Sequence, residues 1–125
     1  MDSSDRRSRG QQMFRKVTLT EPPPPGSAFT EFTLDSVFAE VWSRPGLTWK
    51  ERRWISLTAA AMTGSPVAIK SHVYSALKSG DITPAEMEEF LIHFAHYGGW
   101  PRAAIVQIEI RTALAEIKSS KQGKG

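Results

Sequence analysis

Cysteine is absent from all 125 residues of the sequence. The chain therefore contains no disulfide bond, no cysteine-ligated zinc and no redox-active dithiol. Its composition fits a reducing compartment, and we expect a cytoplasmic protein. No run of about 18 apolar residues is present, so we expect no membrane span. No apolar signal-peptide core follows the polar residues 1–7, so we also expect no secretory leader.

Positive charge is in only small excess, since 16 basic and 13 acidic residues give a formal net charge of +3. Basic residues gather in the two terminal segments, at Arg6, Arg7, Arg9, Arg15, Lys118, Lys121 and Lys124. Basic tails can bind nucleic acid electrostatically. No basic patch with interleaved aromatic residues and no known nucleic-acid motif accompanies them. We therefore expect no nucleic-acid partner.

The length predicts a single domain between two polar terminal segments. Residues 1–27 are rich in Ser, Arg, Gln and Pro and include Pro22 to Pro25, which favour an extended backbone. We interpret this segment as a flexible, proline-rich arm that contributes little to the core. Residues 28–118 are the expected helical domain, and residues 119–125 are the expected basic, disordered tail.

Helical periodicity dominates the central region, and no alternating strand pattern competes with it. Each expected helix begins at a capping or proline signal or ends at glycine or proline. Thr48 with Glu51 and Thr83 with Glu86 are both capping-box pairs. We predict an all-α fold with helices over residues 32–42, 48–63, 65–79, 83–98 and 101–117.

The polar residues that could take part in catalysis or ligand binding are acids and histidines on these helices. Glu51 is either a capping carboxylate or a member of an active site. His72 has Ala68 and Ala76 one turn to either side, which leaves room for a ligand or a packed helix. Another interpretation is that His72 is an ordinary histidine satisfied by one hydrogen bond.

A second group occupies one face of a single helix, because Glu89, His93 and Tyr97 recur every four residues. Together with His96, this group also permits a metal-using enzyme. The spacing is not the His-Glu-x-x-His pattern, and the sequence supplies no obvious remaining ligand, so we expect no metal. Adjacent Arg52 and Arg53 can clamp a carboxylate or form surface ion pairs.

The order and spacing of these residues resemble the γ-carboxymuconolactone decarboxylase family, which is similar to alkylhydroperoxidase D. The resemblance covers about residues 30–117. It is carried by Val41-Trp42-Ser43-Arg44-Pro45-Gly46-Leu47, Lys50-Glu51-Arg52, His72-Val73, Gly80, Glu89, His93, Tyr97 and Gly99-Trp100-Pro101.

The resemblance implies an alkylhydroperoxidase D-like helical bundle of about five to six helices that forms homo-oligomers, commonly trimers or hexamers. In the peroxidase branch an acid, two cysteines and a histidine form a proton relay. The acid falls on Glu51 and the histidine on His72, whereas the cysteine positions fall on Ser65 and Ala68. Peroxidase and disulfide-reductase chemistry is therefore excluded, because no thiolate can form.

The resemblance also implies a decarboxylase without a cofactor that converts 4-carboxymuconolactone to 3-oxoadipate enol-lactone in aromatic catabolism. The lactone carbonyl of this substrate accepts the electrons that the departing carboxylate leaves. We assign proton donation to His72 or His93, tuned by burial and a neighbouring carboxylate, and orientation of the histidine to Glu51. Arg52, Tyr97 and Trp100 are assigned to substrate binding.

Two arginines depart from the family pattern. Arg53 stands where the family usually has a small residue such as serine, and Arg102 interrupts the usual Pro-Ala-Ala. A guanidinium near the site could admit a different carboxylic acid or abolish activity. The alternative to an enzyme is thus a non-catalytic or repurposed helical oligomer with the same fold.

Overall fold

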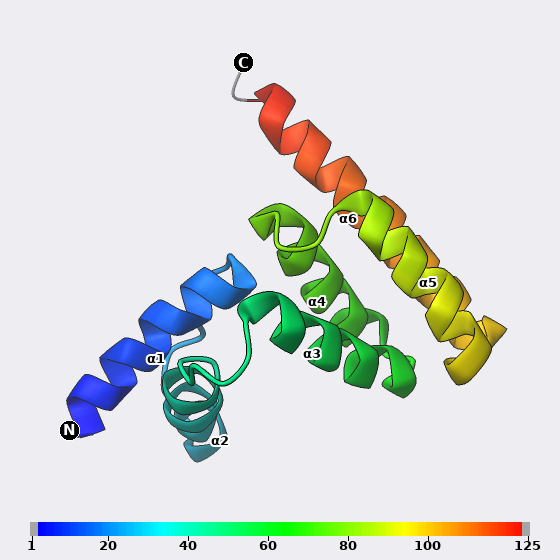
Figure 1. Ribbon diagram of the computed structural model, residues 1–125. Helices are drawn as coiled ribbons and strands as arrows, with labels where there is room; N and C mark the ends of the chain where they lie inside the picture. Colours follow the sequence, from blue (N-terminus) through cyan, green and yellow to red (C-terminus); the bar gives the residue numbers. More distant parts are fainter. Residues whose placement is uncertain (1–2, 124–125) are drawn as a thin grey trace. The chain divides into compact units, whose positions relative to one another are not determined.

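The computed structural model describes residues 3–123, and helices account for most of them (Figure 1). No strand occurs within this range, which confirms the all-α prediction. Nor does this part of the chain hold a helix with the length and apolar character needed to cross a bilayer. The helices are α1 (Ser3–Thr18), α2 (Ala28–Phe32), the π-helix η1 (Thr33–Val41), α3 (Trp49–Thr63), α4 (Pro66–Ser79), α5 (Pro84–Gly98) and α6 (Trp100–Gly123).

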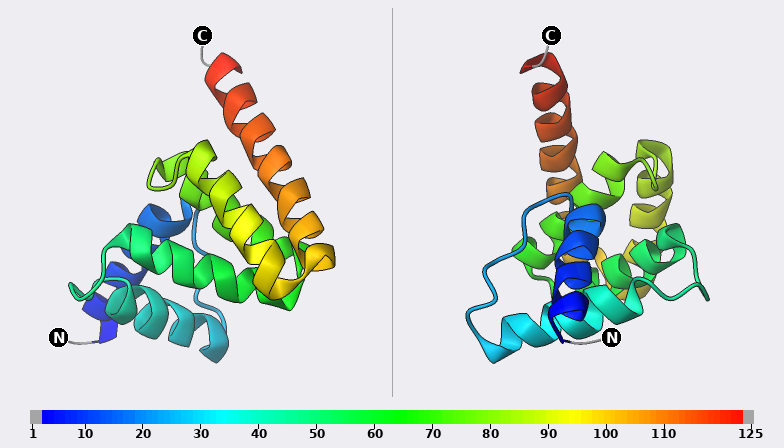
Figure 2. Two further views of the ribbon diagram at one scale, coloured as in Figure 1. Left: turned by 45° about the vertical axis from the view of Figure 1, so that its right-hand side comes forward. Right: turned by 90° about the vertical axis from the view of Figure 1, so that its left-hand side faces the viewer.

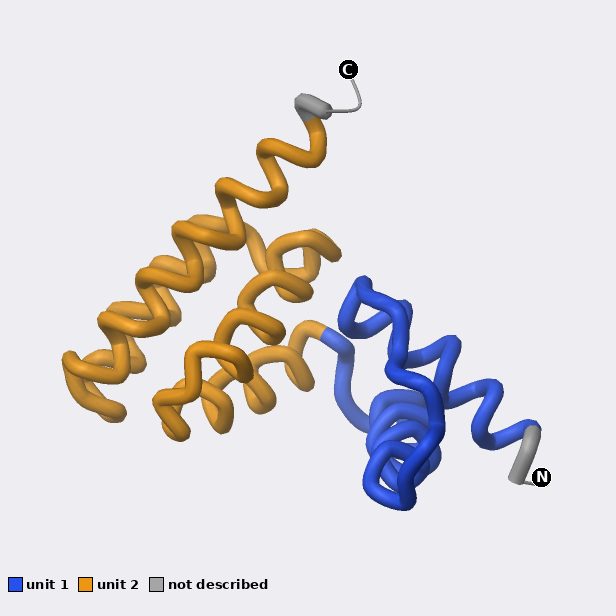
Figure 3. Tube along the Cα trace, turned by 180° about the vertical axis from the view of Figure 1, so that it is seen from behind, with its two compact units in different colours: residues 1–49 blue, residues 50–125 orange. Residues whose placement is uncertain are grey.

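The chain divides into two compact units rather than one domain with an arm and a tail (Figure 3). The first unit comprises residues 1–49 and the second residues 50–125. The boundary falls at the start of α3, about 20 residues beyond the boundary that the proline-rich segment suggested. A proline run therefore did not mark the division between the units.

The expected flexible arm is wrong for most of its length, because residues 3–18 form α1 and pack against η1 (Figure 2). Gly10 is buried where α1 meets the backbone of Leu34. Arg7 adds a two-pronged ion pair, donating from Nε and Nη2 to the Asp35 carboxylate at 2.7 and 2.8 Å. Arginine, glutamine and lysine are good helix formers, so polar composition did not imply disorder here.

An aromatic cluster forms the core of this first unit, so the N-terminal segment does contribute to a core. Phe14 of α1 packs on Phe38 of η1 with ring centroids 4.8 Å apart. Trp42 and Trp49 meet edge to face at 6.1 Å, and Trp49 Nε1 donates to the Trp42 carbonyl oxygen at 3.1 Å. Val17 is buried beside them. The cluster thus ties α1 to the end of η1.

The helix predicted over residues 32–42 is present but is largely a π-helix. Its last bond runs from the Trp42 amide to the Val37 carbonyl oxygen, five residues back, at 3.1 Å. The apolar spacing of residues 32–42 predicted a helix correctly, but this spacing does not distinguish hydrogen bonds to the fourth residue from bonds to the fifth.

The second unit packs α3 to α6 around one apolar core. Helices α4 and α5 both pack against α6, and α5 and α6 lie side by side in Figures 1 and 2. Completely buried side chains from all four helices and the α4–α5 connection fill the interior, including Leu57, Ile69, Val73, Ile82, Met87 and Val106. This core fixes the helix faces that carry the candidate site.

Helix boundaries in the second unit follow the predicted signals. The Thr83–Glu86 capping box is confirmed, since the Thr83 hydroxyl accepts from the Glu86 amide at 3.1 Å and the reciprocal bond is 3.0 Å. Gly80 ends α4 in the left-handed region at φ 81°. Ser65 is the N-cap of α4, but its side chain makes no capping hydrogen bond.

The expected disordered tail is wrong for residues 119–123, which continue α6. Residues 124 and 125 lie outside the described range. Residues 119–122 are two serines, a lysine and a glutamine without proline, so nothing in them interrupts helical hydrogen bonding.

Candidate functional site

The most unusual side chain of the second unit is Arg53, which is only 3% exposed on α3. Its Nε donates to Asp81 Oδ2 at 2.8 Å, in the connection between α4 and α5. Its Nη1 donates to the Ser75 hydroxyl on α4 at 3.3 Å. Arginine stays charged when buried and is seldom buried without such partners. The result is a fixed positive charge held between α3, α4 and the α4–α5 connection.

His72 lies on α4, one turn before Ser75, and is partly buried. Burial lowers the pKa of His72, and the positive charge of Arg53 lowers it further. Both effects disfavour the protonated imidazole. The prediction of a neighbouring carboxylate is corrected here, because the charged group acting on His72 is a guanidinium.

Glu51 is exposed and does not share the helix face of Arg53. Two residues along an α-helix correspond to a rotation of about 200°, so the two side chains leave α3 in nearly opposite directions. Arg52, between them, is partly exposed. The side of α3 that faces His72 thus carries Arg53 rather than the predicted Glu51.

A hollow of about 480 Å³ lies between α3 and α5, and His93 is part of its wall. Trp54 and Phe90 form an apolar surface in it, with stacked rings 5.6 Å apart. Glu86 and Glu89 supply the polar wall. Glu86 is already engaged, because it pairs with Lys50 and closes the capping box of α5. The hollow therefore combines an aromatic floor, one histidine and carboxylates.

His93 stacks on Tyr97 one turn later, with ring centroids 5.2 Å apart. Tyr97 is 84% exposed, so this pair lies on the surface of α5. His96 points elsewhere: its Nδ1 donates to the Ile92 carbonyl oxygen at 2.8 Å. Within residues 3–123, no three histidine, aspartate or glutamate side chains are grouped to hold a metal.

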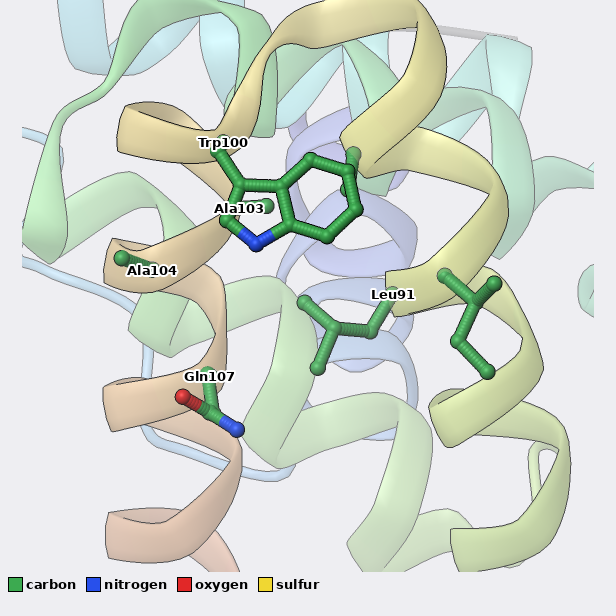
Figure 4. Close-up of a pocket in the computed structure, with 7 residues that line it drawn as sticks. Leu91, Trp100, Ala103, Ala104 and Gln107 are labelled. Carbon is green, nitrogen blue, oxygen red and sulfur yellow. The ribbon is translucent and has the colours of Figure 1, made fainter.

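Trp100 borders a separate, smaller cavity of about 200 Å³ between α5 and α6. Figure 4 shows its indole ring next to Leu91 of α5, with Ala103 and Ala104 on the following turn of α6 and Gln107 further along. Trp100 is 65% exposed. His93 and Trp100 therefore line different cavities of this unit, and His72 lines neither of them.

Sequence reasoning did not single out Ser75, Asp81 or Trp54 for the site. It treated Arg53 as a candidate carboxylate clamp or surface ion pair and as a departure from the family pattern, and it did not predict that Arg53 is buried. A signal for Arg53 was available. Arg53, Leu57, Ala60 and Ala61 follow the i, i+4, i+7, i+8 spacing of one buried helix face. Helical phase alone therefore indicates that the Arg53 side chain enters the core.

These features define an all-α protein with a charged, histidine-containing site and no thiol. The chain belongs to the carboxymuconolactone decarboxylase family, whose sequence model matches residues 27–108. The matched range includes Glu51, His72, His93 and Trp100.

A curated relative is 4-carboxymuconolactone decarboxylase of Acinetobacter baylyi, to which the chain is 29% identical over 73 residues. The alignment covers 58% of this chain and 54% of the relative. The chain thus spans about half the length of that protein.

Proposed function

We propose that the protein is a decarboxylase without a cofactor that acts on a small carboxylated lactone or related carboxylic acid. The first candidate is 4-carboxymuconolactone, with 3-oxoadipate enol-lactone as product. The observation that carries the proposal is the family match over residues 27–108, which contain both His72 and His93. The proposal includes a cytoplasmic role in the catabolism of aromatic compounds, as the family resemblance implies.

The reaction requires little from the protein beyond binding, charge stabilisation and one proton. The bond between the ring carbon and the carboxylate breaks, and carbon dioxide leaves. The electron pair moves through the ring double bond to the lactone carbonyl oxygen. A proton then adds to the carbon next to that carbonyl, which gives the enol-lactone. The protein needs a donor to the developing oxyanion and an acid for the carbon.

The two histidines have different surroundings, and this supports different roles. His93 is exposed at a hollow of about 480 Å³, within the 300–1,000 Å³ that is usual for small-molecule sites. Burial and the positive charge of Arg53 lower the pKa of His72, which disfavours the protonated imidazole that a proton donor to carbon requires. We therefore propose His93 as the proton donor. Glu51 stays proposed as the group that orients a histidine.

Substrate binding is proposed for Arg52, Tyr97 and Trp100. Tyr97 and Trp100 are aromatic side chains of the second unit, and both are largely exposed. Arg52 is partly exposed, and a guanidinium can form two parallel hydrogen bonds with a carboxylate.

A homo-oligomer, as a trimer or a hexamer, is part of the same proposal. It is supported by exposed apolar side chains on both units, including Phe29, Phe32, Ile55, Val67, Trp100 and Ile108. Exposed apolar side chains in such number are typical of surfaces that other subunits cover. Sedimentation equilibrium should give a mass three or six times that of the chain, and a monomer would contradict this part.

The test is to incubate the purified protein with 4-carboxymuconolactone and to measure carbon dioxide release together with the absorbance of the lactone. Release above the spontaneous rate is expected, and it should fall when His93 is replaced by alanine. No release at micromolar enzyme would overturn the substrate assignment.

A second candidate, a non-catalytic helical oligomer, is favoured by one observation. His93 and Trp100 line different cavities, and His72 lines neither. Calorimetry of lactone binding, combined with the carbon dioxide assay, separates the two functions. The second candidate predicts no decarboxylation even where the lactone binds with measurable heat.

A further inference from the structure

A further hollow, of about 400 Å³, lies between the last turn of α4, the first turn of α5 and the C-terminal half of α6. It is lined by Leu77, Pro84, Leu114, Ile117, Lys118 and Lys121. None of these residues lines the hollow of His93 or the cavity of Trp100. Its volume is within the range of about 300–1,000 Å³ that is usual for small-molecule sites. The hollow is therefore a candidate binding site separate from the residues proposed for decarboxylation.

The side chains that α6 contributes to this hollow share one face of the helix. They follow the i, i+3, i+4, i+7 spacing, and they are Leu114, Ile117, Lys118 and Lys121. Ile117 packs against the core of the second unit, whereas Leu114 is 36% exposed. Lys118 and Lys121 are one turn apart on the same face. Lys121 reaches the hollow because residues 119–123 continue α6 instead of forming a loose tail.

Helices α4 and α5 supply apolar wall to the hollow and no unpaired polar group. The Leu77 side chain is buried, and the Leu77 carbonyl oxygen accepts from the Gly80 amide at 3.1 Å. Pro84 has no amide proton to donate. The walls on this side therefore favour an apolar occupant.

The charge at the hollow is positive, and no ion pair offsets it. Neither Lys118 nor Lys121 has an acidic partner within residues 3–123. Glu116, the nearest acid along α6, pairs with Lys70 of α4 at 3.1 Å. Glu116 also lies about 200° around the helix from Lys118, so the two side chains leave α6 in nearly opposite directions. An apolar hollow with two unpaired cations is complementary to an apolar molecule that carries a negative charge.

We propose that this hollow binds a small apolar carboxylic acid, whose carboxylate lies between Lys118 and Lys121 and whose chain covers Leu114. Leu77 and Pro84 form the rest of the apolar surface under the chain. The two ammonium groups donate charge-assisted hydrogen bonds to the carboxylate oxygens. Burial of the chain supplies affinity that two exposed lysines alone would not give. The inference goes beyond the proposed function, because no bond is made or broken in this hollow.

Isothermal titration calorimetry of the full-length protein tests the proposal with octanoate as the probe. Saturable binding of one octanoate per chain is expected, and added salt should weaken it. Acetate keeps the carboxylate without the chain, and 1-octanol keeps the chain without the charge, so both should bind more weakly than octanoate. Absence of saturable binding at millimolar octanoate, or equal affinity for 1-octanol, would overturn the proposal.

Substitutions on α6 locate the site. Lys118→Gln and Lys121→Gln should each weaken octanoate binding about two- to fivefold, and the double variant about tenfold. Leu114→Ala should also weaken it, through loss of apolar contact. Arg111→Gln is the matched control, because it removes one positive charge from an exposed residue of α6 that does not line the hollow. Equal octanoate affinity in the double variant and in Arg111→Gln would overturn the proposal, since the lysine stems would then only cover apolar surface.

Sedimentation equilibrium with and without octanoate separates a small acid from a second copy of the chain as the occupant. The mass of the protein should not change when octanoate is added. Dissociation of the protein by octanoate would show that another subunit covers the hollow, and it would overturn the proposal.

Turnover of 4-carboxymuconolactone should be the same in the wild type and in the lysine variants, because this hollow contains no residue proposed for catalysis. Loss of turnover in folded lysine variants would place the hollow in the catalytic site and overturn a separate binding site. A protein that binds octanoate as expected but does not decarboxylate the lactone would overturn only the proposed function.

Discussion

Gly10 of α1 lies so close to Leu34 of η1 that a β-carbon on Gly10 would stand 2.1 Å from the Leu34 carbonyl oxygen. The neighbouring atom belongs to the backbone of a helix, so it cannot rotate away. The close approach of α1 and η1 therefore requires glycine at this position.

We expect Gly10→Ala to separate α1 from η1 and to destabilise the first unit by at least the 1–3 kcal/mol that is typical of overpacking. Urea unfolding followed by circular dichroism measures this change. Gly26→Ala is the control, because nothing lies within 4 Å of the β-carbon that it would add. Equal stability of the two variants would show that α1 does not pack as described.

Removal of the Thr83 hydroxyl should weaken the second unit through the start of α5. Thr83→Ala removes the bond from the Glu86 amide, and loss of an N-cap side chain costs about 0.5–2 kcal/mol. Ser65 is the matched control, because it occupies the same position on α4 without a capping bond. Thermal unfolding should therefore show a lower Tm for Thr83→Ala than for Ser65→Ala. The reverse order would contradict the assigned caps.

The ion pair between Arg7 and Asp35 should make the first unit sensitive to acid. Hydrogen bonding from Arg7, aided by its charge, lowers the pKa of Asp35. Because the carboxyl binds protons more readily in the unfolded chain, the pair stabilises the fold above the ordinary aspartate pKa and loses this effect as pH falls through the lowered value.

Urea midpoints measured from about pH 5 downward should fall for the wild type and less steeply for Asp35→Asn. Glu88→Gln, on an exposed residue of α5, serves as the charge-matched control and should follow the wild type. A wild-type slope no greater than that of Asp35→Asn would rule out the contribution of this pair.

If the chain is the proposed decarboxylase, His72→Ala and His93→Ala should each lower kcat/KM by about 100-fold or more. His93→Ala removes the proposed acid for carbon, and His72→Ala removes the other histidine proposed for catalysis. His96→Ala should keep near-wild-type activity, because His96 Nδ1 is bonded to the backbone of its own helix. Steady-state kinetics on the lactone gives these values, and near-normal rates in both of the first two variants would refute the assignment.

Local signals in the sequence predicted α3, α4 and α5 well, because each signal lies within a few residues of the boundary it sets. Ser65-Pro66 and Gly80 delimit α4 in this way. Helix α1 was missed because its stabilising contacts are with a distant segment. The apolar side chains by which α1 joins the core of the first unit are Met13, Phe14 and Val17. They pack against η1, which lies about 20 residues further along the sequence.

The candidate site was predictable in its histidines but not in the charges around them. Family resemblance singled out His72 and His93. His72 is partly buried and feels the charge of Arg53, and His93 lines the hollow between α3 and α5. The acid expected near His72 was placed on Glu51, whereas the helix turns Arg53 to that side. Glu51 and Arg53 carry opposite charges, so the sign of the charge on the His72 side of α3 depends on which of the two side chains is turned inward. Arg53 is turned inward because it shares the buried helix face of Leu57 and Ala61, and no motif indicates this.

The four tryptophans are shared equally between the two units, with Trp42 and Trp49 in the first and Trp54 and Trp100 in the second. Intrinsic fluorescence can therefore report on each unit separately. In a Trp42→Phe, Trp49→Phe variant all indole emission would come from the second unit, where Trp54 is stacked on Phe90 and Trp100 is exposed to quenchers such as iodide. Comparison with the complementary Trp54→Phe, Trp100→Phe variant would reveal whether the two units unfold together or one after the other.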